Sequence, residues 1–591
     1  MARIVRRLIG HHASNDWGDR PGLETRSVPT GLRVRRASMA VAAALSMLAV
    51  LGLLAFSLLG GWELLRTAFE SASGTWSFHP LYRALTQHYM LAGPLLNSLL
   101  LAIPVALAAT LLGGLLAWLA VRSDLPGGLW LLPLVALPHV IPGFQLASAW
   151  VEIFSHGGLW QAALGVPAPM SAYGYAAIVV VMTLHLMLFP FLLVASNLQA
   201  ADPALEEAGR IAGLTPAKVF LRITIPLARP ALLGSLLLVF AYVMEEFGIP
   251  SLLGTPSGFE TLTTRIYGLA TTTPLDLSGA SVLALVLGCI ALGVLWMQLR
   301  LWAGTRLETL SGKASRQGRV RLGRWRWPVA VLVWAALCTV ALAPFGALVL
   351  VSLLNSWGQG YGPDHWTGSR YAELLHSEEL RRALRNTLAL ALGSALAGTA
   401  IAVVIAYASQ RFRPRFVGRL ALIADRVSFV TFAVPGLVIG LALILAFSGG
   451  WLPLYGTPWI LLVAYTLRFS GVGVRTVAAR LSQIGVELEA AAEVAGLSRL
   501  RILARIVLPL LAPALVGSAV LIFVNEVKEI SATSLLASQG SETLAYEAYI
   551  RFQEGNYTQG SAVSVVMITG VIAVLLLGRL VGRSTQDLTT T

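Results

Sequence analysis

Two polar segments of the sequence contain the same acidic, glycine and proline residues in the same order, and each lies between long apolar runs. One constant offset in residue number, which we call the repeat offset, takes Glu206 to Glu489, Gly213 to Gly496 and Pro226 to Pro509. An internal repeat identifies the unit from which a chain is built. Here that unit is half of the sequence, so any chemistry of these segments is present twice.

Carboxylates beside a glycine turn are suited to charged contacts with another protein. For one such segment alone, a structured loop that only connects two helices is an equal alternative. Two copies in register favour a docking surface, and they favour a partner with two equivalent faces. The sequence shows no nucleophile grouped with a base and no Cys/His cluster with metal-ligand spacing, so neither catalysis nor a metal site is expected.

The composition is typical of a membrane protein. The chain is 56% hydrophobic and 12% charged, and its mean hydropathy is +0.73. Its net charge of +14 comes almost entirely from arginine, because Lys218, Lys313 and Lys528 are the only lysines. Arginine in cytoplasmic loops explains this charge better than nucleic-acid binding, for which little polar surface remains. Cys289 and Cys338 lie in apolar runs and indicate no disulfide framework.

Apolar runs of about 20 residues are long enough to cross a bilayer as helices. We expect twelve of them, six in each half. Their ranges are 39–61, 95–121, 129–154, 174–198, 231–253 and 279–302, then 328–354, 385–408, 424–447, 457–477, 512–537 and 561–582. Prolines inside these runs are tolerable where neighbouring helices satisfy the backbone.

Arginine is distributed unevenly between the loops on the two sides of these helices. With the N-terminus inside, the inward loops hold most of it, which agrees with the positive-inside rule. Both termini and both polar segments are therefore expected in the cytoplasm. The twelve apolar runs are expected to lie in the lipid bilayer. The expected parts are a basic tail over 1–38, a first core over 39–303, a basic linker over 304–327, a second core over 328–583 and a tail over 584–591.

Each polar segment is expected to form a short helix, a glycine turn and a second helix. Asp202 precedes a proline, a pair that suits the start of the first helix. Gly213 and Gly496 are expected to end that helix in the left-handed backbone conformation. Thr215 and Ser498 stand where a side chain can cap the second helix.

These segments resemble the EAA loop of bacterial ABC importer permeases. After the same spacing as in that family, each glycine is followed by Ile-Thr-Ile-Pro or Ile-Val-Leu-Pro, although the second copy has Ala490 where glutamate is usual. The resemblance implies that loops at about 201–230 and 478–513 are coupling helices that dock on two separate ATPase subunits. The residues it implies for docking are Glu206, Glu207, Ala208, Gly213 and Pro226, then Glu489, Ala490, Ala491, Gly496 and Pro509.

The resemblance covers most of both halves and implies an all-α polytopic membrane protein of the type I ABC importer permease fold. It implies about twelve transmembrane helices in two pseudo-symmetric six-helix halves, located in the bacterial inner membrane. A periplasmic solute-binding protein is the implied source of substrate. The motif that begins at Lys528-Glu529 and the motif Thr263-Thr264-Arg-Ile-Tyr267 resemble the ferric-iron subfamily most. Fused permeases for thiamine, phosphonate or another small solute look similar and stay as alternatives.

A secondary transporter of the major facilitator type is the rival class, because it is also built from six-helix repeats. It predicts buried charges for ion coupling, whereas paired docking helices favour the ABC class. A phosphate-binding loop requires Gly-x-x-x-x-Gly-Lys followed by Ser or Thr, and none of the three lysines has that context. We therefore expect no ATPase site and no cofactor in this chain, with ATP bound by a partner subunit.

Four charged residues fall within the apolar runs at equivalent places. Glu245 and Glu246 correspond to Lys528 and Glu529 at the same repeat offset. Charges inside a membrane are costly and usually face a bundle interior or a water-filled path. They therefore either line the transport pathway or its gate, or lie at the outer interface where their helices end. Packing roles are expected for His185, Glu152, Asp425 and Arg468.

Overall fold

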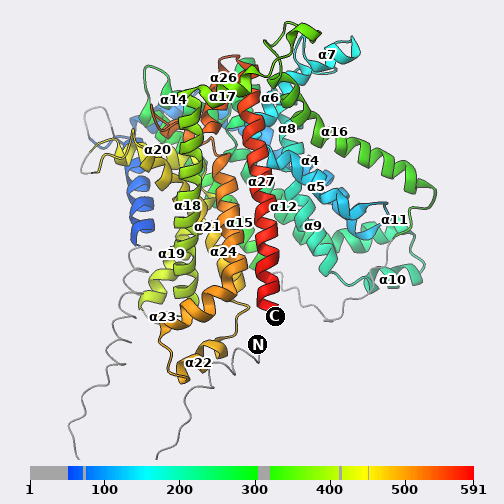
Figure 1. Cartoon of the computed structure of the whole chain (residues 1–591), viewed down its shortest axis with the longest axis vertical. Helices are drawn as coiled ribbons and strands as arrows, with labels where there is room; N and C mark the ends of the chain where they lie inside the picture. The colour runs from blue at the N-terminus through cyan, green and yellow to red at the C-terminus, as the bar shows by residue number, and fades with distance from the viewer. Residues whose placement is uncertain (1–50, 71–74, 304–319, 412–415, 450–451, 591) are drawn as a thin grey trace, which may run out of the picture.

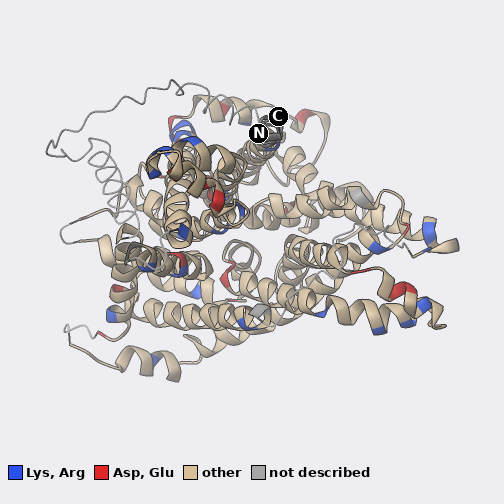
Figure 2. Cartoon of the chain, turned by 90° about the horizontal axis from the view of Figure 1, so that it is seen from below, with Lys and Arg blue, Asp and Glu red and all other residues tan. Residues whose placement is uncertain are grey.

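The computed structural model describes residues 51–70, 75–303, 320–411, 416–449 and 452–590. Every regular element within these ranges is a helix, and extended segments meet only at three isolated bridges. In Figure 1 the long helices α18, α24 and α27 run side by side, with α22 and α23 below them and α26 above, whereas α5, α9 and α16 run obliquely towards α10 and α11 on the right. Seen from below, they carry charged residues only as scattered short bands (Figure 2). The all-α prediction is confirmed, whereas the tail 1–38 and most of the linker 304–327 lie outside the described residues.

The long helices of the two halves follow the same order when the helix at 51–68 is counted before α4 and when α8 and α9 are counted as one span. In the first half they are α4 (Ala92–Arg122), α5 (Leu131–Val140), α6 (Gly143–Phe154), α8 (Tyr175–Leu186), α9 (Leu188–Ala200), α12 (Ile225–Glu245) and α15 (Leu277–Ala303). In the second half they are α16 (Arg326–Ser352), α18 (Glu378–Arg411), α19 (Phe416–Ala433), α20 (Gly436–Phe447), α21 (Pro458–Leu481), α24 (Leu508–Val527) and α27 (Tyr557–Thr590).

Shorter helices join the long ones. They are α3 (His79–Thr86), α7 (Leu159–Leu164), α10 (Ala204–Ile211), α11 (Pro216–Val219), α13 (Gly248–Leu253) and α14 (Leu262–Thr271) in the first half. In the second half they are α17 (Ser369–His376), α22 (Val486–Val494), α23 (Arg499–Ile502), α25 (Thr533–Leu536) and α26 (Leu544–Gln553). Residues 51–68 are also helical and form the described part of the predicted run 39–61.

Nine helices of the described ranges are long and apolar enough to cross a membrane, or eleven if two bent pairs each count as one span. The bent pairs were predicted as the continuous runs 129–154 and 424–447, which is wrong. The chain bends by 94° between α5 and α6 and by 111° between α19 and α20. Pro142 and Pro435 stand at these breaks. A proline disfavours helical backbone at the residue before it, so both halves break at the same place.

The predicted runs 231–253 and 512–537 have the wrong boundaries. The spanning helices begin at Pro216 and Arg499 and end at Glu245 and Val527. Each contains a π-helical turn, over Phe220–Thr224 and Leu503–Val507. A π turn just before Pro226 and its equivalent accommodates the proline, which lacks the N–H of an ordinary helical residue. The apolar residues beyond each span form the separate short helices α13 and α25.

The two halves are interleaved. Helix α16, the first of the second half, packs against α5 and α6 of the first half as well as against α27. Conversely, the helix at 51–68 packs against α20, where the rings of Phe56 and Phe447 are 5.4 Å apart. The largest buried apolar cluster includes residues of both halves, such as Val243 and Leu437. The halves therefore share one core.

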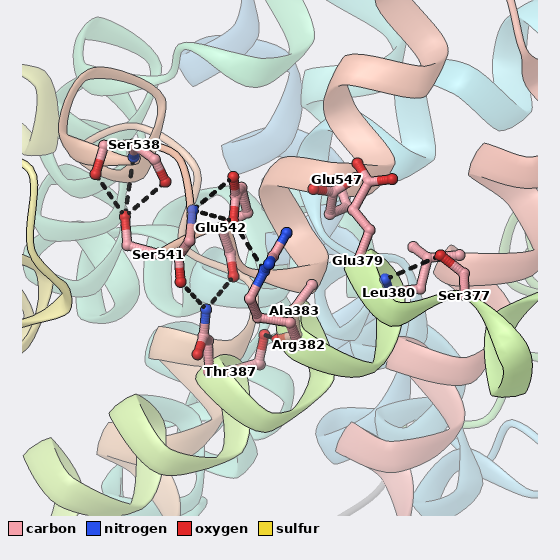
Figure 3. Close-up of polar contacts among 12 residues, drawn as sticks. Ser377, Glu379, Leu380, Arg382, Ala383, Thr387, Ser538, Ser541, Glu542 and Glu547 are labelled. Carbon is pink, nitrogen blue, oxygen red and sulfur yellow. Dashed lines mark hydrogen bonds and ion pairs between the residues drawn. The ribbon is translucent and has the colours of Figure 1, made fainter.

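The end of the bundle opposite α22 repeats one arrangement in each half. Asn97 donates a side-chain hydrogen bond to the carbonyl of Glu260 at 2.9 Å, and Asn386 donates to the carbonyls of Gly540 and Glu542 at 2.9 and 3.0 Å. Figure 3 shows this loop of the second half against the start of α18, with Glu542 facing Arg382 at 3.8 Å. An asparagine near the start of α4 and of α18 thus fixes the loop that leads into α14 or α26.

Candidate functional site: paired docking loops and an axial cavity

The first polar segment forms the predicted helix, turn and helix. Oδ1 of Asp202 accepts a hydrogen bond from the backbone N–H of Ala204 at 2.9 Å, and the next helix is α10. Gly213 follows α10 with φ of +83°. The hydroxyl of Thr215 then accepts from the N–H of Lys218 at 3.4 Å at the start of α11. The cap at Thr215 and the left-handed glycine are confirmed here, whereas the N-cap position of α10 is held by Pro203 and not by Asp202 as predicted.

The second polar segment repeats this geometry around α22 and α23. Gly496 has φ of +87°, and the N–H of the next residue, Leu497, bonds to the carbonyl of Ala492 at 3.0 Å. Ser498 occupies the N-cap position of α23 without a side-chain cap hydrogen bond. The glycine prediction is therefore confirmed in both loops, whereas side-chain capping of the second helix holds for Thr215 alone.

Glu206 is directed into its own chain. Its side chain is 2% exposed and its Oε1 accepts a hydrogen bond from the hydroxyl of Thr224 at 2.9 Å. The same oxygen lies 3.6 Å from Nε of Arg122, the last residue of α4. Arg122 is itself buried and donates to the carbonyl of Ala201 at 3.0 Å. This carboxylate therefore ties the first loop to the end of α4.

Glu489 has the equivalent role in the second loop. Its carboxylate accepts a hydrogen bond from the hydroxyl of Tyr407 at 2.8 Å and pairs with Nε of Arg411 at 2.7 Å. Arg411 is the last residue of α18. We expected Glu206 and Glu489 to contact the partner, but their burial and intrachain pairing support a different role, which is to hold α10 and α22 against their cores.

A row of exposed apolar side chains runs along α10, and an equivalent row runs along α22. In α10, Leu205 and Ile211 are 51% and 88% exposed, and Ala208 lies between them. In α22, the equivalent Leu488 and Val494 are 41% and 90% exposed. Residues three apart lie on one helix face. Sequence reasoning missed these apolar positions, although their recurrence at the repeat offset was a usable signal. Ala491, the equivalent of Ala208, lies in the second row, and exposed residues beside the rows include Glu207, Pro226, Ala490 and Pro509.

A second candidate site is a cavity of about 120 Å³ between the two halves. It lies where α12 and α24 end, and its wall combines residues of both halves that are equivalent at the repeat offset. These pairs are Tyr242 and Asn525, Glu245 and Lys528, Glu246 and Glu529, and His185 and Arg468. Positions related by a pseudo-twofold axis meet only close to that axis. We therefore name this space the axial cavity.

Glu246 and Glu529 cap the short helices that follow the spans. Oε1 of Glu246 accepts the N–H of Ile249 at 3.2 Å, at the start of α13. The carboxylate of Glu529 accepts the N–H groups of Ala532 and Thr533 at 2.9 and 3.1 Å, at the start of α25. A carboxylate at a helix start is stabilised by unpaired backbone donors. The two equivalent residues thus share one structural role.

Arg468 joins the charges of the cavity. Its guanidinium lies 3.5 Å from Oε1 of Glu245, in the other half, and 3.3 Å from Oε1 of Glu529. Nζ of Lys528 donates to the carbonyl of His139, again in the other half, at 3.2 Å. Arg468, for which a packing role was expected, is a mostly buried residue with two ion pairs in the cavity wall. The spans do end beside these charges, as one interpretation expected, but the charges face an internal cavity.

Two interleaved helical cores, each with one helix–glycine–helix loop, define a membrane permease built from two repeats. A sequence model of the binding-protein-dependent transport system inner membrane component family matches residues 109–308 and 398–586, one stretch in each half. The chain belongs to this family. It is a multi-pass permease subunit of an ABC importer that receives substrate from a binding protein, and it is not the ATPase. The major facilitator alternative is wrong.

Similar proteins match either most of this chain, across both cores, or one core only. A putative ferric transport system permease protein of Haemophilus influenzae is 29% identical over 491 residues, covering 81% of this chain and 75% of that protein. An Fe(3+)-transport system permease protein of the same organism is 24% identical over 484 residues, covering 81% of this chain and 88% of that protein. The sulfate transport system permease protein of Escherichia coli is 30% identical over 251 residues, covering 40% of this chain and 85% of that protein.

Proposed function

We propose that this chain is the permease of an ATP-driven importer of ferric iron. The observation that carries the proposal is the length of the matches. The two proteins described as ferric permeases match 81% of the chain and therefore extend across both cores. The sulfate permease matches 40% of it. A substrate assignment based on relatives that match both cores is better supported than one based on a relative that matches a single core.

Uptake by a deletion strain tests the cargo. A strain that lacks this chain should lose binding-protein-dependent uptake of radioactive ferric iron, and the full-length gene should restore it. Uptake of thiamine, phosphonate and sulfate by the same cells is the control. Unchanged iron uptake together with loss of one of the others would replace iron by that solute and leave the permease role intact.

The docking proposal concerns the cytoplasmic partners. Two ATPase subunits dock on the exposed apolar rows of α10 and α22, while Glu206 and Glu489 hold these helices in place. The support is the equal exposure of Ile211 and Val494, at 88% and 90%, in equivalent positions. Large apolar side chains exposed at the centre of a small patch are typical of protein interfaces. In this arrangement the loops and both termini face the cytoplasm, and the binding protein meets the opposite end.

Mass measurement of the purified complex tests this arrangement. One copy of this chain and two ATPase copies are expected, because one polypeptide holds both docking loops. Val494→Glu and Ile211→Glu should each reduce the bound ATPase without reducing the amount of this chain in the membrane. Gln483→Glu, at an exposed position beside α22, is the matched control. Two copies of this chain in each complex, or full ATPase retention in both variants, would refute the arrangement.

A further inference from the structure

The axial cavity contains two kinds of polar contact, those within one half and those between halves. Glu246 and Glu529 bond to backbone groups of their own halves, and Arg468 pairs with Glu529 inside the second half. The pair between Arg468 and Glu245 crosses from one half to the other, as does the bond from Lys528 to His139. Separation of the two halves at this cavity must break both crossing contacts.

Separation affects the two partners of the crossing ion pair differently. Arg468 keeps the carboxylate of Glu529, which belongs to its own half. Glu245 loses the guanidinium of Arg468, its cationic partner. The other titratable residues that its own half contributes to the cavity are Glu246, His139, His185 and Tyr242, and none of them is a lysine or arginine. A buried carboxylate without a counter-ion is strongly destabilised. In the open state Glu245 therefore needs another cation.

The local backbone makes room for this pair. Gly436 begins α20 directly after the break at Pro435, and a side chain at this position would overlap the guanidinium of Arg468. Nδ1 of His139 is buried in the cavity wall and has no hydrogen-bond partner. The first-half wall thus offers a carboxylate and an unpaired imidazole nitrogen, which are groups that interact favourably with small cations.

We propose that the axial cavity is the crossing point of the transport path, where Arg468 acts as a built-in counter-ion of Glu245 that a cationic cargo replaces when the halves separate. The contact is electrostatic and transient. The described residues contain no group of three or more His, Cys, Asp or Glu side chains that could hold a metal ion. The cationic nature of the cargo rests on the proposed iron transport, whereas the gating role of the pair does not.

Two variants separate the gate from the cargo contact. Arg468→Gln removes the counter-ion, so ATP hydrolysis by the reconstituted complex without binding protein should rise about tenfold, the effect of about 1.4 kcal/mol on a two-state equilibrium. Its iron uptake should persist because Glu245 remains. Glu245→Gln should raise the same hydrolysis and also reduce iron uptake about tenfold. Glu245→Asp, which keeps the charge, should restore uptake.

The matched control is Arg475→Gln. Arg475 lies two turns further along α21 and pairs at 3.4 Å with Asp425, a residue of the same half, so its loss should leave both readouts unchanged. Wild-type hydrolysis in both Arg468→Gln and Glu245→Gln would refute the gate, and full uptake in Glu245→Gln would refute the cargo contact. Loss of both variants from the membrane, with Arg475→Gln present, would assign the pair to folding and overturn the proposal. Absence of iron uptake by the wild type would refute the proposed cargo alone, because the hydrolysis readout still tests the gate.

Discussion

Replacement of Gly496 isolates the contribution of one turn to coupling. Gly496 has φ of +87°, and no atom lies within 4 Å of the place where a side chain would begin. The cost of a substitution is therefore the backbone conformation alone, without a steric clash. Asparagine tolerates this conformation, alanine less so, and a β-branched residue least. The series Gly496→Asn, Gly496→Ala and Gly496→Val should thus damage the loop in increasing order.

The size of the effect follows from the strain. A non-glycine residue in a sparsely populated backbone region costs about 1–3 kcal/mol, and valine should lie near the top of that range. Such a free energy corresponds to about a 5- to 150-fold change in an equilibrium. The docking helix would then be correctly placed in a small minority of molecules. The membrane-spanning helices should remain folded, because the turn lies outside them.

Membrane amount, ATPase retention and uptake should be measured for each variant of the series. We expect normal insertion, together with uptake and stimulated ATP hydrolysis that decrease from Asn to Ala to Val. Gly517→Val is the control, since its added side chain also meets open space but its backbone is not left-handed. Equal uptake in Gly496→Asn and Gly496→Val would refute the strain argument, and full uptake in valine variants of both Gly213 and Gly496 would refute the coupling role of the loops.

Three further predictions concern contacts that hold the ends of the core helices. Glu489→Gln should weaken the seating of α22 by about 1.5–3 kcal/mol, the worth of a hydrogen bond to a charged group, and so lower ATPase retention, whereas the exposed Glu487→Gln should not. Asn386→Ala removes two hydrogen bonds and should lower thermal stability in detergent by about 1–2 kcal/mol, which a thermal unfolding measurement checks. Burial alone would raise the pKa of Asp276, but the N–H of its neighbour at 279 and an arginine hold that pKa below its usual range. The stability that its charge provides should therefore be present at neutral pH and be lost as the pH falls through the acidic range, so the difference between wild type and Asp276→Asn should shrink there.

Local rules predicted the glycine turns of the two loops. A capping side chain, a proline at the first turn and a glycine after the last turn each act within a few residues, and Gly213 and Gly496 have the conformation that the sequence predicted. The partners of Glu206 and Glu489 were not predictable in this way. Arg122 and Arg411 end α4 and α18, which lie several helices earlier in the chain, and only the packed structure brings them to the loops.

The broken spans show where hydropathy alone misleads. The runs 129–154 and 424–447 are apolar throughout, so a window of hydropathy treats each as one helix. The backbone nevertheless turns before Pro142 and Pro435, whose preceding residues are forced away from helical geometry. The prolines were visible in the sequence, and the glycine that follows each of them, at Gly143 and Gly436, was the signal to give them more weight.

The sequence repeat pairs the residues that line the axial cavity, but it does not show that they enclose a cavity. The repeat offset pairs His185 with Arg468 and Glu245 with Lys528, yet a repeat does not say which equivalent positions lie near the axis. The structure supplies that information by placing both pairs around one small cavity. Two equal charges at equivalent positions beside an axis would face each other in a poorly solvated space and repel strongly. Glu246 and Glu529 can both be glutamate because each carboxylate caps a helix of its own half. The two residues of a pair that faces across the axis must differ in charge, as His185 differs from Arg468 and Glu245 from Lys528. Because of this difference Arg468 can form an ion pair with Glu245 across the cavity, and in the proposed mechanism this ion pair closes the path.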